Sequence, residues 1–229
     1  MLHGYLPNIL DGATVTLTVA LASLAIAVML GLAGAAMKLS ASRAARSLAT
    51  VYTTVIRGVP DLVLMLLIFY GGQLAINELA PRLGYAGYVD INPFVAGVLT
   101  IGFIFGAYLT ETFRGAIIAI PAGQREAGIA YGMSQWQVFA RIIFPQMVRF
   151  ALPGFTNNWL VLVKSTALVS VIGLSDMMSR AGHAAGATRE PFTFYLTVAA
   201  LYLLITGVSN LLLGMLQKRY ALGVRTASL

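Results

Sequence analysis

Long apolar stretches dominate this chain and alternate with short segments that carry most of its charges. Residues 13–37 and 192–217 contain no charged side chain, and the apolar stretches 48–76, 94–113 and 145–174 contain few. About 20 mainly apolar residues can cross a bilayer as a helix. In hydrocarbon every backbone polar group needs an internal partner, so these stretches must be helices. The pattern predicts an all-α membrane protein with five transmembrane helices and a single domain over residues 1–229.

Two of the five stretches contain residues that disturb a helix. The second is broken near Gly58-Val59-Pro60, because proline lacks the N–H that a helix interior requires. The fourth starts near Pro145, extends through Trp159 and continues past Lys164. We expect a broken second span and a fourth span with an apolar continuation.

The composition excludes several classes of protein. Apolar residues make up 59% of the chain and charged residues 10%, against about 45–50% and 25% in soluble domains. A soluble enzyme, a disordered chain and a free-standing nucleic-acid reader are therefore excluded. There is no cysteine and no metal-ligand spacing of histidines, so we expect no metal site. Ser, His and Asp occur but form no recognisable nucleophile motif, so we expect no catalytic residue.

The basic residues indicate how the chain is oriented. The net charge is +7, from 15 Lys and Arg against 8 Asp and Glu. Eleven of the fifteen lie between Lys38 and Arg57, between Arg114 and Arg149, or from Lys218 onward. With five spans, these segments share one side of the membrane. The positive-inside rule then places the N-terminus outside and the C-terminus in the cytoplasm.

The connection between the third and fourth spans, about residues 114–144, is far longer than a helix–helix turn. Loops of that length are usually functional. Its apolar residues recur at helical steps, and Gly132 falls between two short helical stretches. A helix–Gly–helix unit on the cytoplasmic side predicts a docking element. An amphipathic stretch resting on lipid is the alternative.

The motifs in this connection resemble a known family. Glu126-Ala127-Gly128, then Gly132, Ile142 and Pro145, follow the spacing E-A-A-x3-G-x9-I-x-x-P, the signature loop of permease subunits of ATP-binding-cassette (ABC) importers. Segments 57–62, 110–115 and 121–124 are similar to the polar amino acid branch. Asn157 and the run from Lys164 resemble its N-x6-K-x-T-S-L motif. The resemblance covers nearly the whole chain and is closest to the Q-type permeases of histidine/lysine/arginine/ornithine importers. Opine importer permeases look similar.

Two positions depart from the family pattern. Gly128 replaces the usual alanine, which should cost about 1 kcal/mol of helix propensity and little else. Ser165 replaces the usual aspartate and removes a carboxylate from the expected substrate region. A cationic substrate would then need its counter-charge from another residue or another chain.

The resemblance implies a type I ABC importer permease fold and a division of labour. The chain has no G-x4-G-K-[ST] loop for ATP phosphates, so it is not itself the enzyme and binds no cofactor. ATP and Mg would be held by two ATPase subunits. The family also implies a second permease, for which a homologous M-type subunit is favoured, and a periplasmic amino-acid-binding protein. The setting is the bacterial inner membrane, with lipid around the spans. In the loop, Arg125, Glu126, Ala127, Gly132 and Pro145 are the expected ATPase-coupling residues.

Asp61 is the leading candidate for a substrate contact. It lies about 13 residues into the second apolar stretch, roughly 20 Å along a helix at 1.5 Å per residue. A carboxylate at that depth costs several kcal/mol unless it is paired or hydrated, and marks a cavity. Asp61 is interpreted as the counter-ion of a basic amino acid. The alternatives are a cap for the half-helix opened by Pro60 and an ion pair with Arg57.

Further polar residues of the fourth span are expected along the substrate path: Asn157, Asn158, Trp159, Lys164, Ser165 and Thr166. Trp159 could stack on a guanidinium; interhelical hydrogen bonding and interface anchoring are the alternatives. For Lys164 a pairing role is favoured over direct contact with a cation. Glu111 and Arg114, three residues apart, are expected to form an ion pair.

These observations predict a permease subunit of an ATP-driven importer for basic amino acids (histidine, lysine, arginine, ornithine). Within that class, opines and other polar amino acids such as glutamine remain possible substrates. A self-contained secondary transporter is the alternative from another class, although no convincing internal repeat is present. A structural scaffold would leave Asp61 and the long connection unexplained.

Overall fold

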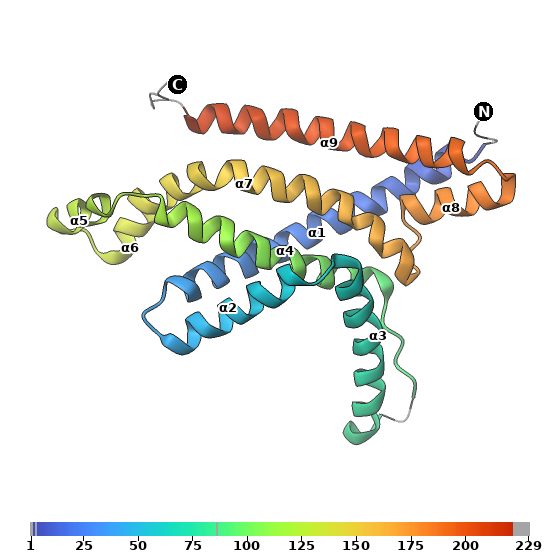
Figure 1. Ribbon diagram of the computed structural model, residues 1–229, viewed down its shortest axis with the longest axis horizontal. Helices are drawn as coiled ribbons and strands as arrows, with labels where there is room; N and C mark the ends of the chain where they lie inside the picture. Colours follow the sequence, from blue (N-terminus) through green and yellow to red (C-terminus); the bar gives the residue numbers. More distant parts are fainter. Residues whose placement is uncertain (1, 3, 86, 222–229) are drawn as a thin grey trace.

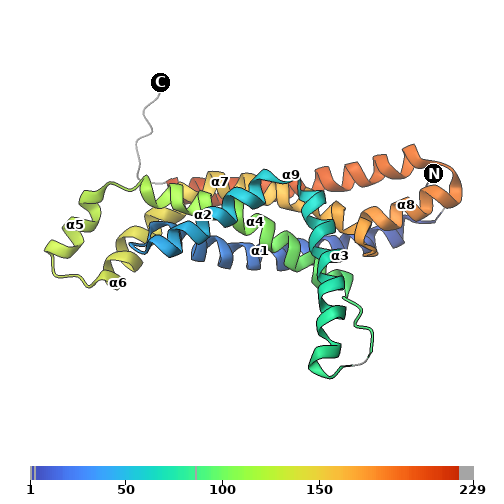
Figure 2. The same ribbon diagram turned by 60° about the horizontal axis from the view of Figure 1, so that its bottom comes forward.

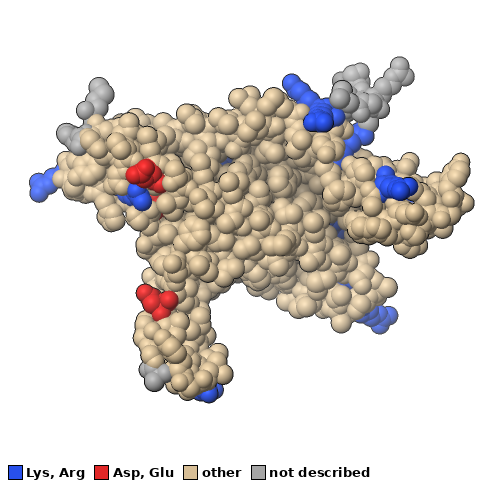
Figure 3. Space-filling view, turned by 180° about the vertical axis from the view of Figure 1, so that it is seen from behind, with Lys and Arg blue, Asp and Glu red and all other residues tan. Residues whose placement is uncertain are grey.

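The computed structural model describes residues 2, 4–85 and 87–221, and this part of the chain is built from helices without strands. Five helical segments are long and apolar enough to cross a membrane: Leu6–Leu39, Asp61–Leu83, Pro93–Ile118, Gln135–Ile172 and Pro191–Tyr220. The all-α architecture and the five spans are therefore confirmed. Lys and Arg gather mainly at one end of the molecule, whereas the broad middle of the visible face is uncharged (Figure 3). Arg225 lies outside the described residues.

Helices α1 (Leu6–Leu39) and α4 (Pro93–Ile118) form the centre of the bundle. Glycines on each helix let the two backbones approach closely. A methyl group at Gly31 would lie 2.7 Å from Leu109 Cβ, and one at Gly106 would lie 2.8 Å from Leu30 Cβ. Small residues at such crossings are how membrane helices gain packing without a hydrophobic driving force.

Helices α7 (Phe144–Ser165) and α9 (Pro191–Ala221) run roughly along the same axis and complete the bundle (Figures 1 and 2). The 3-10 helix η3 (Thr166–Ile172) extends α7, as the expected apolar continuation of the fourth span. A short helix, α8 (Met177–Thr188), precedes α9 and lies at the end of the bundle where α1 begins. Its start is capped by Asp176, whose side chain accepts from the Ser179 N–H at 2.9 Å. The apolar pattern did not predict this helix.

The second apolar stretch is not one broken span but two helices with different directions. Helix α2 (Arg43–Gly58) packs beside α1 and α4, and α3 (Asp61–Leu79) points away from the bundle in both views (Figures 1 and 2). Val59 and Pro60 between them are extended, with ψ of 138° and 137°. Pro60 disfavours a helical conformation at Val59 and cannot donate to the α2 carbonyls. Of these two helices, only α3 is long and apolar enough to count as a span.

Helix α3 and the chain that follows it form an arm. After the 3-10 turn η1 (Pro81–Leu83), residues 89–91 return along α3 and are held by amide side chains. Ile91 N–H donates to Gln73 Oε1 at 2.9 Å, and Val89 N–H donates to Asn77 Oδ1 at 2.8 Å. These bonds stand in for a backbone partner, so the return segment stays ordered beside the helix.

The long connection contains α5 (Ala122–Ala130), α6 (Gln135–Val138) and a π-helical turn, η2 (Phe139–Ile143). Helix α4 continues to Ile118, beyond the expected start of the connection at residue 114. Pro145 sits in the first turn of α7, where the fourth span was expected to start, and the π turn before it keeps the helix continuous by accommodating its missing N–H.

Candidate functional site

Helix α2 presents three different faces. One is buried against α1 and α4, and a second exposes Leu48, Val51 and Val55. The third is polar and exposed along the whole helix at steps of three and four residues. We call it the α2 stripe, and it consists of Arg43, Arg46, Ser47, Thr50, Thr54 and Arg57. Such a row is costly next to hydrocarbon, so it indicates a water-filled path or a partner subunit.

The α2 stripe ends at the helix break, where Arg57, Asp61 and Tyr108 of α4 come together. The Arg57 Cζ atom lies 5.4 Å from the centroid of the Tyr108 ring, within cation–π range. Asp61 is half-buried in the first turn of α3, and both charges lie close enough to act on the Tyr108 phenol electrostatically. Asp61 forms no ion pair with any described residue. The alternative of an ion pair with Arg57 is therefore not observed, and the Arg57 guanidinium lies over the aromatic ring.

A polar groove of about 500 Å³ runs from this point toward the α1–α2 turn. Its lining comes from α1, α2 and α4: Lys38, Thr53, Thr54, Arg57, Gly58, Tyr108, Glu111 and Arg114. Arg114 Nε donates to Glu111 Oε2 at 3.0 Å, so the structure contains the ion pair that the spacing predicts. Glu111 also pairs with Lys38, whose ammonium donates to Thr53 Oγ1 at 2.7 Å. This network joins three helices at one level.

The fourth-span candidates occupy different sides of α7. Asn157 is exposed, and Asn158 Nδ2 donates to Thr112 Oγ1 on α4 at 2.9 Å. Trp159 is 8% exposed and Thr166 is fully buried. The Thr166 hydroxyl donates to a backbone carbonyl 2.6 Å away. Burial places Trp159 and Thr166 behind the polar face rather than on it.

Lys164 and Ser165 lie at the C-terminal end of α7. Lys164 is exposed and Ser165 half-buried. Lys164 borders a second hollow of about 610 Å³, which α9 lines with Tyr195, Tyr202 and Thr206. It forms no ion pair with any described residue, Asp61 included. Polar side chains of α2, α4 and α7 that are not fully buried form what we call the polar face, and they comprise the α2 stripe, Tyr108, Glu111, Thr112, Asn157 and Asn158. Lys164 lies on the α9 side of α7.

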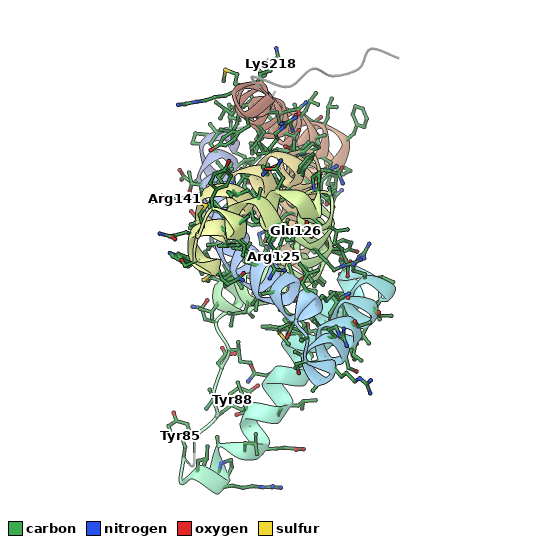
Figure 4. The ribbon with its side chains drawn as sticks, turned by 90° about the vertical axis from the view of Figure 1, so that its left-hand side faces the viewer. Tyr85, Tyr88, Arg125, Glu126, Arg141 and Lys218 are labelled. Atoms are coloured by element: carbon green, nitrogen blue, oxygen red, sulfur yellow. The ribbon has the colours of Figure 1, made fainter. Side chains whose placement is uncertain are left out.

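The long connection forms a separate element at the end of the molecule. Arg125 and Glu126 of α5 are exposed there, as is Arg141 of the π turn η2 (Figure 4). Arg125 Nη2 donates to Gln135 Oε1 of α6 at 3.4 Å. Gly132, between the two helices, has a φ of +77°, a conformation that favours glycine. The geometry is the helix–Gly–helix unit predicted from the sequence.

Gly128 has a packing role that its helix propensity does not describe. A methyl group there would lie 2.8 Å from Ile142 Cδ1 and 3.0 Å from Val138 Cγ2. Glycine thus lets α5 lie close to α6 and the π turn. The expectation that this departure costs helix propensity and little else is incomplete, because alanine would force the Ile142 side chain to move.

Two parts of the site were missed by sequence reasoning. The α2 stripe could have been found from its own period, since its polar residues recur every three or four positions. The Lys38 contribution had no such signal, because Lys38 and Glu111 are 73 positions apart. Among the described residues no three His, Asp or Glu side chains gather as a metal site would require.

Comparisons with known proteins identify the family of this chain. The sequence profile of a family described as "Binding-protein-dependent transport system inner membrane component" matches residues 27–222. The histidine/lysine/arginine/ornithine transport system permease protein HisQ of Escherichia coli (strain K12) is 52% identical over 100% of both chains. The octopine transport system permease protein OccQ of Rhizobium radiobacter is 43% identical over 95% of this chain and 92% of its own. A crystal structure of an amino acid ABC transporter with histidines superposes with a TM-score of 0.79 at 32% identity, covering 94% of this chain and 95% of that one.

Proposed function

This chain belongs to the family of inner membrane components of binding-protein-dependent transport systems, and on that basis we propose that it is a permease subunit of an ATP-driven importer for basic amino acids. The proposed substrates are histidine, lysine, arginine and ornithine. Permease subunits of this family are not enzymes themselves. The polar amino acid class is supported by full-length similarity to a permease whose name lists these four amino acids.

The observation that carries the proposal is the environment of Asp61. Its half-exposed carboxylate stands at a helix break, without an ion-pair partner among the described residues and next to the Tyr108 ring. A carboxylate at the start of an apolar span needs a counter-charge or water, and broken helices often frame transporter sites. A lysine or arginine side chain can supply the cation and stack on the aromatic ring.

We propose that the substrate passes along the polar face. Asp61, Asn157 and Ser165 would contact the substrate, and Lys164 would border the path. Asn158 would contribute the part of its amide that does not bond to Thr112. Trp159 and Thr166 would act from behind by fixing the position of α7. The ion pair of Glu111 and Arg114 holds the inner end of the path in place.

The connection between α4 and α7 is proposed to be the coupling element. Arg125, Glu126 and Ala127 on α5 would dock on an ATPase subunit, and Gly132 would allow the turn. Pro145 would mark the point where movement of the coupling element is transmitted to α7. Closure of the ATPase pair would then rock the spans between two states, as coupling requires. ATP and Mg would be bound by the ATPase, and this chain would bind no cofactor.

The proposed assembly contains two permeases, two ATPase subunits and a periplasmic amino-acid-binding protein. A homologous M-type permease is the proposed partner of this chain. We place the assembly in a bacterial inner membrane. The α1–α2 turn, the coupling element and the end of α9 share the end with most of the basic residues (Figures 1 and 4), which supports a cytoplasmic location for that end.

An opine importer is the second candidate, because OccQ is 43% identical over 95% of this chain. The test uses the complete transporter in lipid vesicles, with ATP inside and the loaded binding protein outside. ATP-dependent uptake of radiolabelled arginine and lysine is expected, and uptake of octopine is not. If octopine is taken up and the basic amino acids are not, the substrate assignment is wrong. Arginine accumulation by vesicles that contain this chain alone would overturn the importer assignment.

A matched pair of variants tests the role of Asp61. Asp61→Asn is expected to lower arginine uptake at least tenfold, because the amide cannot balance a cation, while the subunits still co-purify. Asp90→Asn, an exposed aspartate on the arm beyond α3, is the control and should transport normally. Normal uptake by Asp61→Asn would remove the counter-ion role.

A further inference from the structure

The α2 stripe carries charge of one sign only. Its three charged members are arginines, and its other members are serine and threonine. It runs from the α1–α2 turn to the helix break, which is the length of path between the basic end of the molecule and Asp61 (Figure 1). Asp61 and Arg57 therefore lie together at the helix break, and Arg46 and Arg43 follow toward the α1–α2 turn.

Ion pairs with nearby carboxylates do not neutralise the positive charge next to the α2 stripe. In the groove beside the stripe, Lys38, Arg57 and Arg114 face a single carboxylate, Glu111. Glu111 is already engaged with Lys38 and Arg114. Arg57 has no ion-pair partner among the described residues and rests on the face of Tyr108. The groove thus has an excess of two positive charges next to the site proposed for a cationic substrate.

We propose that Arg57, with Arg46 and Arg43 further along the α2 stripe, favours release of the substrate to the cytoplasm by weakening the binding of a cation at Asp61 from the inner side. A basic amino acid that leaves Asp61 moves through this positive region to the cytoplasm. A barrier alone would slow exit and entry alike, so the effect is on affinity: the Arg57 charge near Asp61 destabilises a cation bound there, which favours release and disfavours rebinding from the inside. This inference rests on the proposed function and adds to it a property of the inner path.

The size of the effect follows from Coulomb's law. One unit charge about 8 Å from another, at an effective dielectric constant of about 20, changes binding by more than tenfold before screening. Ions in a water-filled path reduce this, because the Debye length is about 8 Å at physiological ionic strength. We expect removal of the Arg57 charge to tighten binding of cytoplasmic arginine about fivefold to tenfold.

The experiment measures inhibition of uptake by arginine on the inner side. Vesicles containing the complete transporter are loaded with ATP and increasing unlabelled arginine, and the initial uptake of labelled arginine from the loaded binding protein is followed. Arg57→Gln is expected to shift the half-inhibiting internal arginine concentration five- to tenfold lower. Arg57→Lys keeps the charge and should behave as the wild type. Arg82→Gln, an exposed arginine on the arm, is the matched control.

Two further readouts separate this role from a merely structural one. Loss of packing on Tyr108 would change uptake equally with and without internal arginine, and would appear in Arg57→Lys as well. Raising the internal salt concentration of wild-type vesicles should lower the half-inhibiting concentration, and should lower it less in Arg57→Gln, where the charges that remain to be screened are the more distant ones. The proposal is overturned if Arg57→Gln and wild type share one inhibition curve or, should that variant not assemble, if salt has no effect on the wild type. Absence of any wild-type arginine uptake would instead refute the proposed function.

Discussion

Asn158 of α7 and Thr112 of α4 are joined by a hydrogen bond of 2.9 Å in the middle of the polar face. The amide nitrogen of Asn158 donates, and the Thr112 hydroxyl in turn donates to the Tyr108 carbonyl at 3.2 Å. The bond fixes the spacing of the two helices that flank the proposed path. Asn157, one position earlier, is exposed and free to meet a substrate.

The two asparagines are therefore expected to respond differently to replacement by alanine. Asn158→Ala should destabilise the protein by about 1 kcal/mol, since interhelical hydrogen bonds in membranes contribute roughly that much. Asn157→Ala should leave stability within about 0.5 kcal/mol, as surface substitutions usually do, and should lower uptake. Thermal unfolding in detergent and uptake in vesicles give the two readouts. Equal melting temperatures for both variants would contradict the structural role of Asn158.

The Lys38–Glu111–Arg114 network predicts a larger effect. Glu111→Gln leaves the Lys38 ammonium, whose side chain is 11% exposed, without its carboxylate. Removing one partner of a buried pair costs about 3 kcal/mol or more, and partial exposure of the network should reduce this to about 2 kcal/mol. The double variant Lys38→Met/Glu111→Gln should recover part of the loss, because neither charge then stands alone. A double-mutant cycle on melting temperature checks the coupling, and additive losses would argue against it.

Gly132 predicts an effect on coupling rather than on packing. Its φ of +77° is strained for side chains that bear a Cβ, yet a Cβ there would meet nothing within 4 Å. Gly132→Ala should cost about 1 kcal/mol locally, Gly132→Val more, and Gly132→Asn less. Arginine uptake per ATP hydrolysed should therefore fall least in Gly132→Asn, more in Gly132→Ala and most in Gly132→Val. Gly123→Ala, in open space within α5, is the control, and a uniform ratio across the series would show that the turn is not part of coupling.

Much of the fold could be predicted because lipid imposes strict rules on sequence. Uncharged runs near Gly31 and Leu203 can only be membrane helices, and the break at Pro60 follows from its missing N–H. The direction that α3 takes after the break could not be predicted. Proline ends the ladder of hydrogen bonds, but contacts with α4 and η3 set the angle.

The candidate site was predictable where its residues are close in sequence. The pairing of Glu111 and Arg114 follows from their spacing, and Asp61 is conspicuous between apolar residues. The burial of Trp159 and Thr166 was not predictable, because the sequence of α7 does not tell which side meets α4 and which meets α9. The α2 stripe was predictable from its helical period, and it was missed because residues 48–58 were assigned to a membrane span whose faces were not distinguished.

Asp176 provides a prediction about pH. Its side chain is fully buried at the start of α8, outside the five spans, and its Oδ2 atom finds no hydrogen-bond partner among the described residues. Burial raises the pKa of this carboxyl above its usual value, although the backbone N–H of Ser179 and the charge of Arg180 oppose the shift. The folded protein therefore holds this proton to a higher pH than the unfolded chain does.

The sign of the resulting pH dependence follows from linkage. Between the unfolded pKa, about 3.9, and the raised folded value, the folded state binds more protons, so this group's contribution to stability falls as the pH rises through that window. Asp176→Asn keeps an oxygen to cap Ser179 and cannot ionise, so its stability relative to the wild type should be greater at pH 7 than at pH 4. Melting temperatures across that range provide the measurement, with Asp11→Asn, an exposed aspartate of α1, as the control. A difference between Asp176→Asn and wild type that stays constant with pH would show that the carboxyl does not titrate differently on folding.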